Sequence, residues 1–401
     1  MIRSVRELVA PEDVGVALPH DHVLHNIGAV AATNGDLEIR MEDLMDFRRA
    51  PFAHGGRNLL LQKEDEAFRE LERLQQHKLH KLKPLVVDVT LPTEGRDALV
   101  KERLRLAERL KDLHLLTVAT FEVEKLNEKF CIGLSPQEQS ERVAKTLEAE
   151  LVFGIEGAGV VAFPGAMYQQ IHVKSGGLLT AKEEILVQGL ALAQARTHAP
   201  LYLSFSIDEA AGSAELEQAI RTWIRNLLDA GAESKKLVVC HADRWCRGDV
   251  QGAGYAFLLE LLGLGVSVLF DLVGLLAVSD SRYVSQILLS TNVYQRIQYR
   301  RYGGGGYTYL FEKFKHRLLR QGVAEIQWDE IVRANVVNLL AWYVPPEAPP
   351  IPKNYLQCSI CENYFEPIEG EYFTKFTFTY CGTKCLRRHS RQKFAPLPAK
   401  K

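Results

Sequence analysis

The sequence predicts a (β/α)₈ barrel of the TIM type, followed by a small C-terminal zinc-binding module. Over most of the chain, eight apolar runs typical of buried parallel strands alternate with amphipathic helical stretches. Near the C-terminus, four cysteines cluster behind a proline-rich segment. Tight cysteine pairs of this kind are typical of zinc ligands, and they indicate a reducing compartment rather than a disulfide framework.

The predicted strands are short, rich in β-branched residues and bounded by turn residues. They are residues 15–20, 85–90, 114–120, 170–173, 201–205, 237–241, 266–272 and 287–290. Helical periodicity lies between several of them, for example at residues 181–196, 214–228 and 255–262. In such a barrel, the C-terminal ends of all strands lie on one face, and ligands bind there.

The composition is that of an ordinary globular chain. Its 401 residues are 47% hydrophobic and 25% charged, with a net charge of −1, so there is no overall charge to attract nucleic acid or a membrane. The apolar stretch 258–278 contains Glu260 and Asp271, so we expect a helix and a strand there rather than a membrane span. The charged N-terminus does not read as a secretory signal, and we expect an intracellular protein of the cytoplasm, nucleus or mitochondrial matrix.

Several predicted strands end in a polar residue. His20 and His22 alternate along the first strand, so their imidazoles share one face and could begin a metal site. The residues at the strand ends are His20, His22, Asp88, Thr120, His172, Ser204, His241, Asp271 and Asn292. Four histidines at the ligand-binding face predict a site for metal or catalysis.

Four motifs in order carry a resemblance to a known family. They are His20-Asp-His22 after GVALP, VVDVTLPTEGRD at 86–97, FGIEGAGV at 153–160 and IHVKSGG at 171–177. Together they resemble the phosphotriesterase-related branch of the amidohydrolase superfamily, over residues 10–345. The resemblance implies a barrel with two metal ions. Their ligands would be an H-x-H on the first strand, a carboxylated Lys or a Glu on the fourth, His on the fifth and sixth, and Asp on the eighth.

Carried over onto this chain, three of those ligand positions match and three are altered. The resemblance assigns His20, His22 and His241 to their family positions. It places His172 at the fourth-strand position, Ser204 at the fifth and Asn292 at the eighth, while a register shift would bring Lys174 to the fourth. An imidazole lacks the two oxygens that bridge two metals, and an amide cannot accept a proton from water at neutral pH.

Two functions follow as expectations. The first is a catalytically impaired pseudoenzyme, in which a degraded barrel acts as a scaffold or interaction protein. The alternative is a hydrolase of an ester, lactone or phosphoester with one zinc or other divalent metal on His20, His22 and His172. Asp88, Asp243 or Asp271 would then supply an outer carboxylate, and a small molecule would be the substrate.

The tail forms a separate predicted module. We expect a barrel at 1–343, a proline-rich linker at 344–352 and a zinc finger at 353–401, with no membrane partner. Its structural zinc would bind Cys358, Cys361, Cys381 and Cys385, with His389 as the alternative to Cys385. The segment YCGTKCLRRHSR resembles treble-clef fingers of the MYND and HIT type. From Cys381 onward there are seven Lys and Arg and no acidic residue, so we expect docking to a protein, or else to RNA, unless these charges only offset the thiolates.

Overall fold

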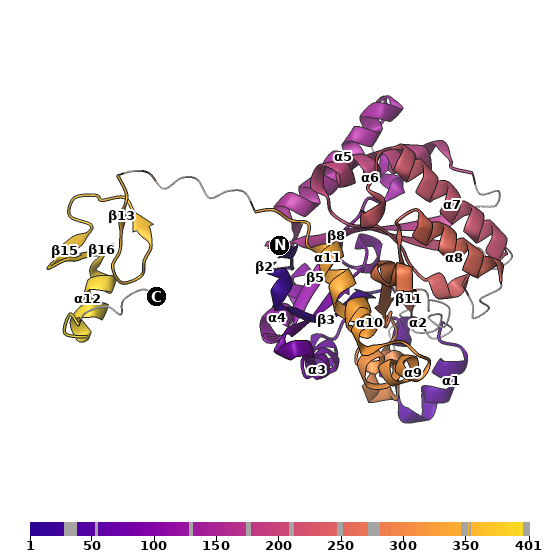
Figure 1. The fold of residues 1–401 in the computed structure, drawn as a ribbon, viewed down its shortest axis with the longest axis horizontal. Helices are drawn as coiled ribbons and strands as arrows, with labels where there is room; N and C mark the ends of the chain where they lie inside the picture. The colour runs from indigo at the N-terminus through magenta and orange to yellow at the C-terminus, as the bar shows by residue number, and fades with distance from the viewer. Residues whose placement is uncertain are drawn as a thin grey trace. The chain divides into compact units, whose positions relative to one another are not determined.

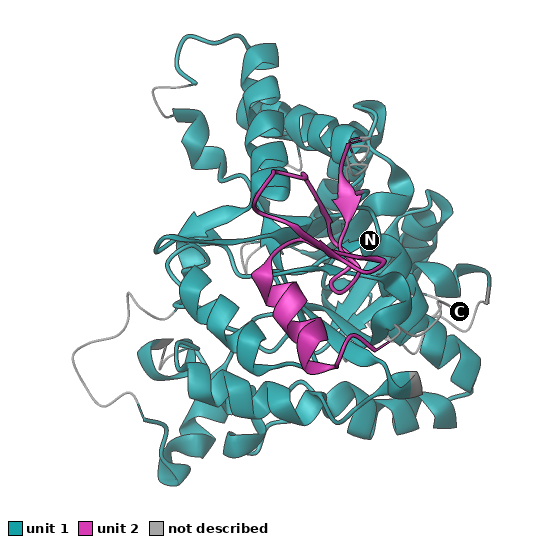
Figure 2. Ribbon diagram, turned by 90° about the vertical axis from the view of Figure 1, so that its left-hand side faces the viewer, with its two compact units in different colours: residues 1–344 teal, residues 345–401 magenta. Residues whose placement is uncertain are grey.

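The computed structural model describes residues 1–27, 38–52, 55–127, 131–173, 178–207, 212–246, 252–271, 281–345, 352 and 354–395. Its contacts divide the chain into two compact units, residues 1–344 and 345–401 (Figure 2). In the described ranges, no helix combines the length and the apolar character needed to cross a bilayer.

The first unit is an eight-stranded parallel barrel with helices around it (Figure 1). The strands are β3 (Val14–Asp21), β4 (Lys83–Asp88), β5 (His114–Ala119), β8 (Pro164–Val173), β9 (Leu201–Ile207), β10 (Leu237–Val239), β11 (Ser267–Asp271) and β12 (Ile287–Ser290). They neighbour one another in chain order, so the predicted barrel is confirmed. The fourth strand, however, begins at Pro164 rather than at residue 170.

The helices that cover the barrel follow the strands in sequence. They include α3 (Glu64–Leu74), α4 (Val100–Arg109), α5 (Pro136–Phe153), α6 (Ala181–Thr197), α7 (Ser213–Asp229), α8 (Ala253–Gly263), α9 (Lys315–Arg320), α10 (Glu325–Asp329) and α11 (Asn335–Leu340). Two short helices, α1 (Leu44–Arg49) and α2 (Gly55–Asn58), precede α3. Ser135 and Glu138 form a capping box at the start of α5, which satisfies N–H groups that the helix itself cannot bond.

The core has two layers because successive strand residues point to opposite faces of the sheet. Leu116 and Val87 belong to the packed barrel interior, whereas their neighbours Leu115 and Val86 pack in the larger cluster that includes the helices. All four side chains are essentially inaccessible to solvent. Burying each contributes about 1.5–3 kcal/mol. The barrel is therefore held together by a large apolar core.

Side chains join the first and last strands. The carboxylate of Asp21 on β3 accepts hydrogen bonds from Ser290 Oγ (2.6 Å), Thr291 Oγ1 (2.6 Å) and the Val293 N–H (2.7 Å). The His22 N–H also donates to the Val293 carbonyl, at 3.0 Å. Burial raises the pKa of Asp21 to about 7, against the opposing effect of these donors. A single buried carboxyl group therefore ties β3 to β12.

The second unit is small. It contains two hairpins, β13 (Leu356–Gln357) with β14 (Tyr364–Phe365) and β15 (Phe373–Lys375) with β16 (Phe378–Tyr380), followed by helix α12 (Thr383–Arg391). Among its described residues, Cys358, Tyr380 and His389 are the buried ones. Three side chains cannot supply a stabilising core, so the unit needs another source of stability.

Candidate metal centres

A local irregularity at the end of β3 turns the histidine pair toward the barrel interior. Ala17 lies in the interior cluster and Leu18 in the outer one, and the register with β4 shifts between Leu18 and Asp21. One extra residue reverses the alternation of side chains. His20 and His22 consequently share the inner face, as their spacing predicts, while Asp21 contacts β12.

His20 lies at the centre of the ring cluster. It is 1% exposed, and its ring centroid lies 4.7 Å from that of His241, 5.5 Å from Tyr168 and 6.3 Å from His22. Neither ring nitrogen has a hydrogen-bond partner among the described residues. Burial, followed by the nearby His241, lowers the pKa of His20 to about 3, so the imidazole is neutral. A buried polar atom without a partner is unfavourable, so these nitrogens are suited to a ligand.

His22 is held by a chain of buried polar groups. Its Nδ1 lies 3.2 Å from Thr90 Oγ1, and that hydroxyl donates to Asp88 Oδ1 at 2.6 Å. Asp88 also pairs with Arg103, whose Nε lies 2.7 Å from Oδ2. Asp88, one of the predicted outer carboxylates, is therefore linked to His22 through Thr90, and the charge of Arg103 already neutralises it. His25, which we had not selected, packs its ring 5.5 Å from that of His22.

The sixth, seventh and eighth strands contribute a connected triad. His241 Nδ1 contacts Asp271 Oδ2, and Asn292 Nδ2 donates to the same oxygen at 3.0 Å. Both His241 (φ 59°) and Asn292 (φ 46°) adopt the left-handed backbone conformation. Non-glycine residues held this way cluster at functional sites. Burial raises the pKa of Asp271, whose second oxygen has no partner within the described part of the chain.

The fourth strand corrects our placement of His172. That side chain is exposed, and its Nδ1 lies 3.2 Å from Ser206 Oγ beyond the ring cluster. The residue of β8 that contacts His20 is Tyr168, four positions earlier, and its hydroxyl is hydrogen-bonded to Ser204. Our prediction missed Tyr168 because it began the strand at residue 170. Lys174, the register-shift alternative, lies outside the described residues.

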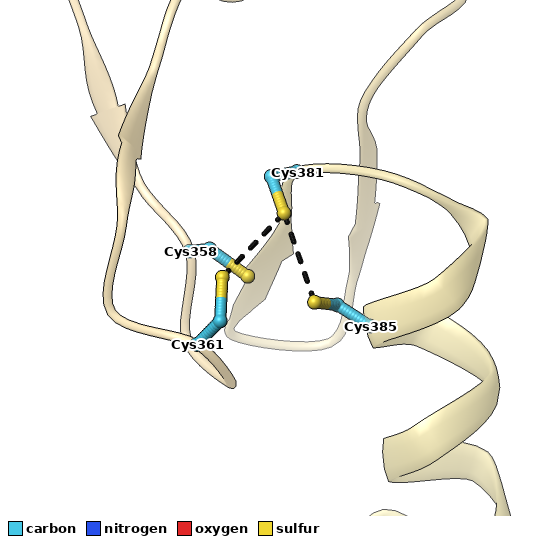
Figure 3. A group of neighbouring side chains, drawn as sticks. All are labelled: Cys358, Cys361, Cys381 and Cys385. Carbon is cyan, nitrogen blue, oxygen red and sulfur yellow. Dashed lines mark hydrogen bonds between the residues drawn. The ribbon is translucent and has the colours of Figure 1, made fainter. Parts of the chain in front are cut away.

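Four thiols in the second unit form a compact group (Figure 3). The sulfur atoms of Cys358, Cys361, Cys381 and Cys385 all lie within 4.8 Å of one another. Burial raises the pKa of Cys358, but backbone N–H donors from Cys361, Cys381 and Ile360 outweigh it and lower the pKa to about 6. Thiolates at this spacing suit a tetrahedral zinc ion. The residues fit a structural zinc, which would link the two hairpins to α12.

His389, our alternative ligand, has a different role. Its Nδ1 lies 3.0 Å from the Tyr380 hydroxyl and its Nε2 2.9 Å from the Ala395 carbonyl oxygen. Its ring lies edge-on to Phe378, with the centroids 4.7 Å apart. With both nitrogens engaged, His389 belongs to the small buried core, and Cys385 is the fourth member of the thiol group.

Comparison with known proteins identifies both units. The profile of the phosphotriesterase family matches residues 1–340. The chain belongs to the phosphotriesterase family. A second profile, the Vms1-associating treble clef domain, matches residues 353–397. This match confirms a treble clef in the C-terminal unit.

The family relatives share about a quarter of their residues with this chain. A phosphotriesterase-related protein of Nematostella vectensis is 24% identical over 376 residues, which cover 84% of this chain and 97% of the relative. An N-acetyltaurine hydrolase of Homo sapiens is 23% identical over 368 residues, covering 83% and 96%.

Solved structures agree with the fold. A resiniferatoxin-binding protein from Rhodobacter sphaeroides is 22% identical, with a TM-score of 0.66, over 84% of this chain and 94% of that one. A phosphotriesterase homology protein from Escherichia coli, complexed with phosphate, is 17% identical, with a TM-score of 0.58, over 82% and 99%.

The two-metal centre implied by the family does not fit the residues of this barrel. Tyr168 stands at the inner face of the fourth strand, and burial raises its pKa far above neutral pH, so it offers a neutral phenol rather than a bridging anion. Ser204 replaces an imidazole, and the Asn292 amide is already bonded to Asp271. Of the described residues, the C-terminal thiols are the one group with three or more ligand atoms within 4.8 Å of one another.

Proposed function

We propose that the barrel has lost the two-metal hydrolysis of its family and serves as a scaffold that the treble clef links to a protein partner. The observation that carries this proposal is that Tyr168 packs against His20 from the fourth strand, where the family resemblance implies a bridging carboxylate or carboxylated lysine. Two cations repel one another unless an anion lies between them. A phenol bonded to Ser204 does not provide that anion.

The proton chemistry supports the same proposal. Hydrolysis requires a group that takes a proton from the attacking water. Asn292 cannot do so, and its amide hydrogen and the ring of His241 both engage one oxygen of Asp271. One oxygen of the carboxylate best placed to act as a base is therefore committed to holding its neighbours.

The treble clef offers the docking surface. Lys384, Arg387, Arg388 and Arg391 of α12 are exposed, and Phe376 on the β15–β16 hairpin is 76% exposed. Exposed aromatic and cationic side chains on one small unit are typical of a protein interface. We propose an acidic protein surface as the partner, in a reducing compartment where the zinc thiolates persist.

A second candidate, hydrolysis with one metal, has one observation in its favour. The two nitrogens of His20 and Oδ1 of Asp271 are buried and lack partners among the described residues. A single divalent ion bound by one His20 nitrogen and by Oδ1 of Asp271 would satisfy two of these three atoms. N-acetyltaurine is then the first substrate to test, because curated relatives are named for its hydrolysis.

Metal counting on the full chain separates the two candidates. We expect one zinc per wild-type chain, one in His20→Ala, and none in Cys381→Ser, because the treble clef would hold the single ion. Two metals in the wild type and one in His20→Ala would place a metal in the barrel and contradict the proposal.

Turnover provides the second test. Wild-type protein supplied with Zn²⁺, Mn²⁺ or Co²⁺ would be assayed against N-acetyltaurine, an aryl lactone and an aryl phosphotriester. We expect no hydrolysis above that of His20→Ala. Hydrolysis that disappears in His20→Ala, with zinc retained in the treble clef, would overturn the scaffold proposal and establish the one-metal hydrolase.

The docking surface can be tested with defined polymers. We expect polyglutamate to bind the full chain, and the double variant Arg387→Glu/Arg388→Glu to lose that binding while keeping its zinc. Tighter binding of poly(U) than of polyglutamate would assign the surface to RNA instead. A variant that still binds polyglutamate normally would show that α12 is not the docking surface.

A further inference from the structure

A pocket opens where β9 and β10 end, and Arg244, three residues after His241, lines it. It has a volume of about 610 Å³, within the range of small-molecule sites. Its described lining is about equally polar and apolar. The apolar part includes Phe205, Leu216, Trp245 and Tyr255, and the charged residue of the lining is Arg244. A pocket with aromatic side chains, polar groups and one cation is suited to an organic molecule that carries one negative charge.

Arg244 differs in its partners from three arginines that are almost fully buried in the barrel, Arg96, Arg103 and Arg296. The guanidinium nitrogens of Arg96 lie 2.9 Å from Glu150, Nε of Arg103 lies 2.7 Å from Asp88, and Nη2 of Arg296 lies 2.9 Å from Glu66. Arg244 is exposed and donates to the Phe205 carbonyl at 3.3 Å. No described carboxylate oxygen lies within 4.0 Å of its guanidinium nitrogens. Its positive charge is therefore available to a ligand.

The backbone around Arg244 is fixed in place. The residue ends a short 3₁₀ turn, Ala242–Arg244, that begins after the left-handed His241. The next side chain, Trp245, is 5% exposed and packs against Phe257 with ring centroids 5.1 Å apart. The Cys246 N–H donates to the Ala242 carbonyl at 2.7 Å. A rigid turn lowers the entropic cost of holding a ligand.

The charge of Arg244 also reaches the histidine cluster. It contributes to lowering the pKa of His20 and opposes the effect of burial on the pKa of Asp271. A ligand anchored at Arg244 would therefore lie at the same end of the barrel where the family carries its chemistry. Binding there requires neither a metal nor hydrolysis.

We propose that this pocket binds a small organic acid, whose carboxylate or phosphate pairs with Arg244 and whose apolar part lies against Trp245 and Tyr255. A guanidinium presents a fork of N–H donors that matches the oxygens of either acid. The proposal goes beyond the scaffold function, because it gives the barrel a ligand that does not depend on catalysis.

Matched probes of one shape test the proposal. Isothermal titration calorimetry on the full chain would compare phenylacetate and phenyl phosphate with the neutral phenylacetamide. We expect at least one of the acids to bind about tenfold or more tightly than the amide, because only the acids form a charge-assisted hydrogen bond with the guanidinium. Whichever acid binds more tightly identifies the acidic group.

Variants locate the charge. Arg244→Gln should reduce the affinity for the acid about tenfold or more and leave phenylacetamide binding unchanged. Arg73→Gln, at an exposed position on α3, is the matched control and should change neither affinity. Thermal melting of each variant checks that the barrel is folded, and Arg244→Lys should retain part of the preference for the acid.

Three results would overturn the proposal. The first is equal binding of the acids and the amide. The second is an Arg244→Gln variant that keeps the preference for the acid, and the third is that neither acid binds at millimolar concentration. In each case the organic-acid site is refuted, whereas the metal counts that test the scaffold proposal are unaffected.

Discussion

The two parts of the chain that carry metal-type residues are built differently. In the treble clef, four thiols lie within 4.8 Å of one another and connect elements that have hardly any other core. In the barrel, the ring of His20 lies 4.7 Å from that of His241 and 6.3 Å from that of His22. The ring of Tyr168, from the fourth strand, lies 5.5 Å from that of His20. A unit that needs metal to fold must keep every ligand. A barrel with a large apolar core keeps its shape when ligands are replaced, so its metal site is free to change.

The treble clef and the barrel should differ most in stability when one of the predicted zinc ligands of the treble clef is removed. Cys381→Ser should abolish zinc binding and unfold residues 353–395, because structural zinc contributes about 10–16 kcal/mol in small fingers. Metal analysis and NMR of the full chain would measure the loss. All four tryptophans lie in the barrel, so tryptophan fluorescence should show an unchanged urea midpoint for that unit.

His389→Gln is the companion variant. Because His389 contacts Tyr380 and Ala395 rather than the thiols, the variant should keep one zinc although the module becomes less stable. Loss of zinc from His389→Gln, with retention in Cys381→Ser, would reverse our assignment of the ligands.

In the barrel, the corresponding test removes one partner of the buried ion pair between Asp88 and Arg103. Asp88→Asn would leave the charge of Arg103 buried at 1% exposure without its carboxylate. Removing one partner of a buried pair costs about 3–5 kcal/mol. Urea unfolding followed by tryptophan fluorescence should show the loss. Asp112→Asn removes a surface carboxylate paired with Lys78 and should change little. Equal midpoints for the two variants would mean that the Asp88–Arg103 pair does not stabilise the barrel.

The contrast between the units explains which predictions succeeded. The cluster of four cysteines in the treble clef could be predicted from the sequence because a zinc site requires both a residue type and a spacing, as in Cys358 and Cys361. The eight strands could be read because buried parallel strands form apolar runs. Neither inference depends on which residues meet across the fold.

The barrel site could be predicted only in part. The alternation of side chains along a strand predicted that His20 and His22 share one face. That this face is the inner one depends on a shift of register after Leu18, which no local pattern indicates. Which residue of the fourth strand faces the cluster, Tyr168 or His172, depends on where β8 begins. Strand boundaries are the least certain part of such predictions. His172 is four residues from the contact position, so a small error at the strand start moved the inferred ligand out of the site.

Asp21 should make the stability of the barrel depend on pH. Its folded pKa is about 7, above the unfolded value near 3.9. Between these values the folded state binds more protons, so stability falls by about 2–4 kcal/mol as pH rises from 5 to 8. Asp21→Asn should remove much of this slope in urea midpoints measured by tryptophan fluorescence. Burial also raises the pKa of Glu94 to about 7, so part of the slope should remain. An unchanged slope in Asp21→Asn would show that this carboxyl group does not hold its proton in the folded state.

The smallest expected effect comes from removing a helix cap in the barrel, and it tests whether the two units are stable independently. Ser135 Oγ accepts a hydrogen bond from the Glu138 N–H at 3.3 Å at the start of α5. Ser135→Ala should cost about 1 kcal/mol of barrel stability, whereas Ser135→Asp should retain the cap. The melting temperature of the barrel should fall by about 2–4 °C. Zinc in the treble clef should be held equally well in both variants, because no ligand depends on α5. If Ser135→Ala instead weakened zinc binding, the treble clef would depend on the barrel for its stability, and the metal would no longer be its sole support.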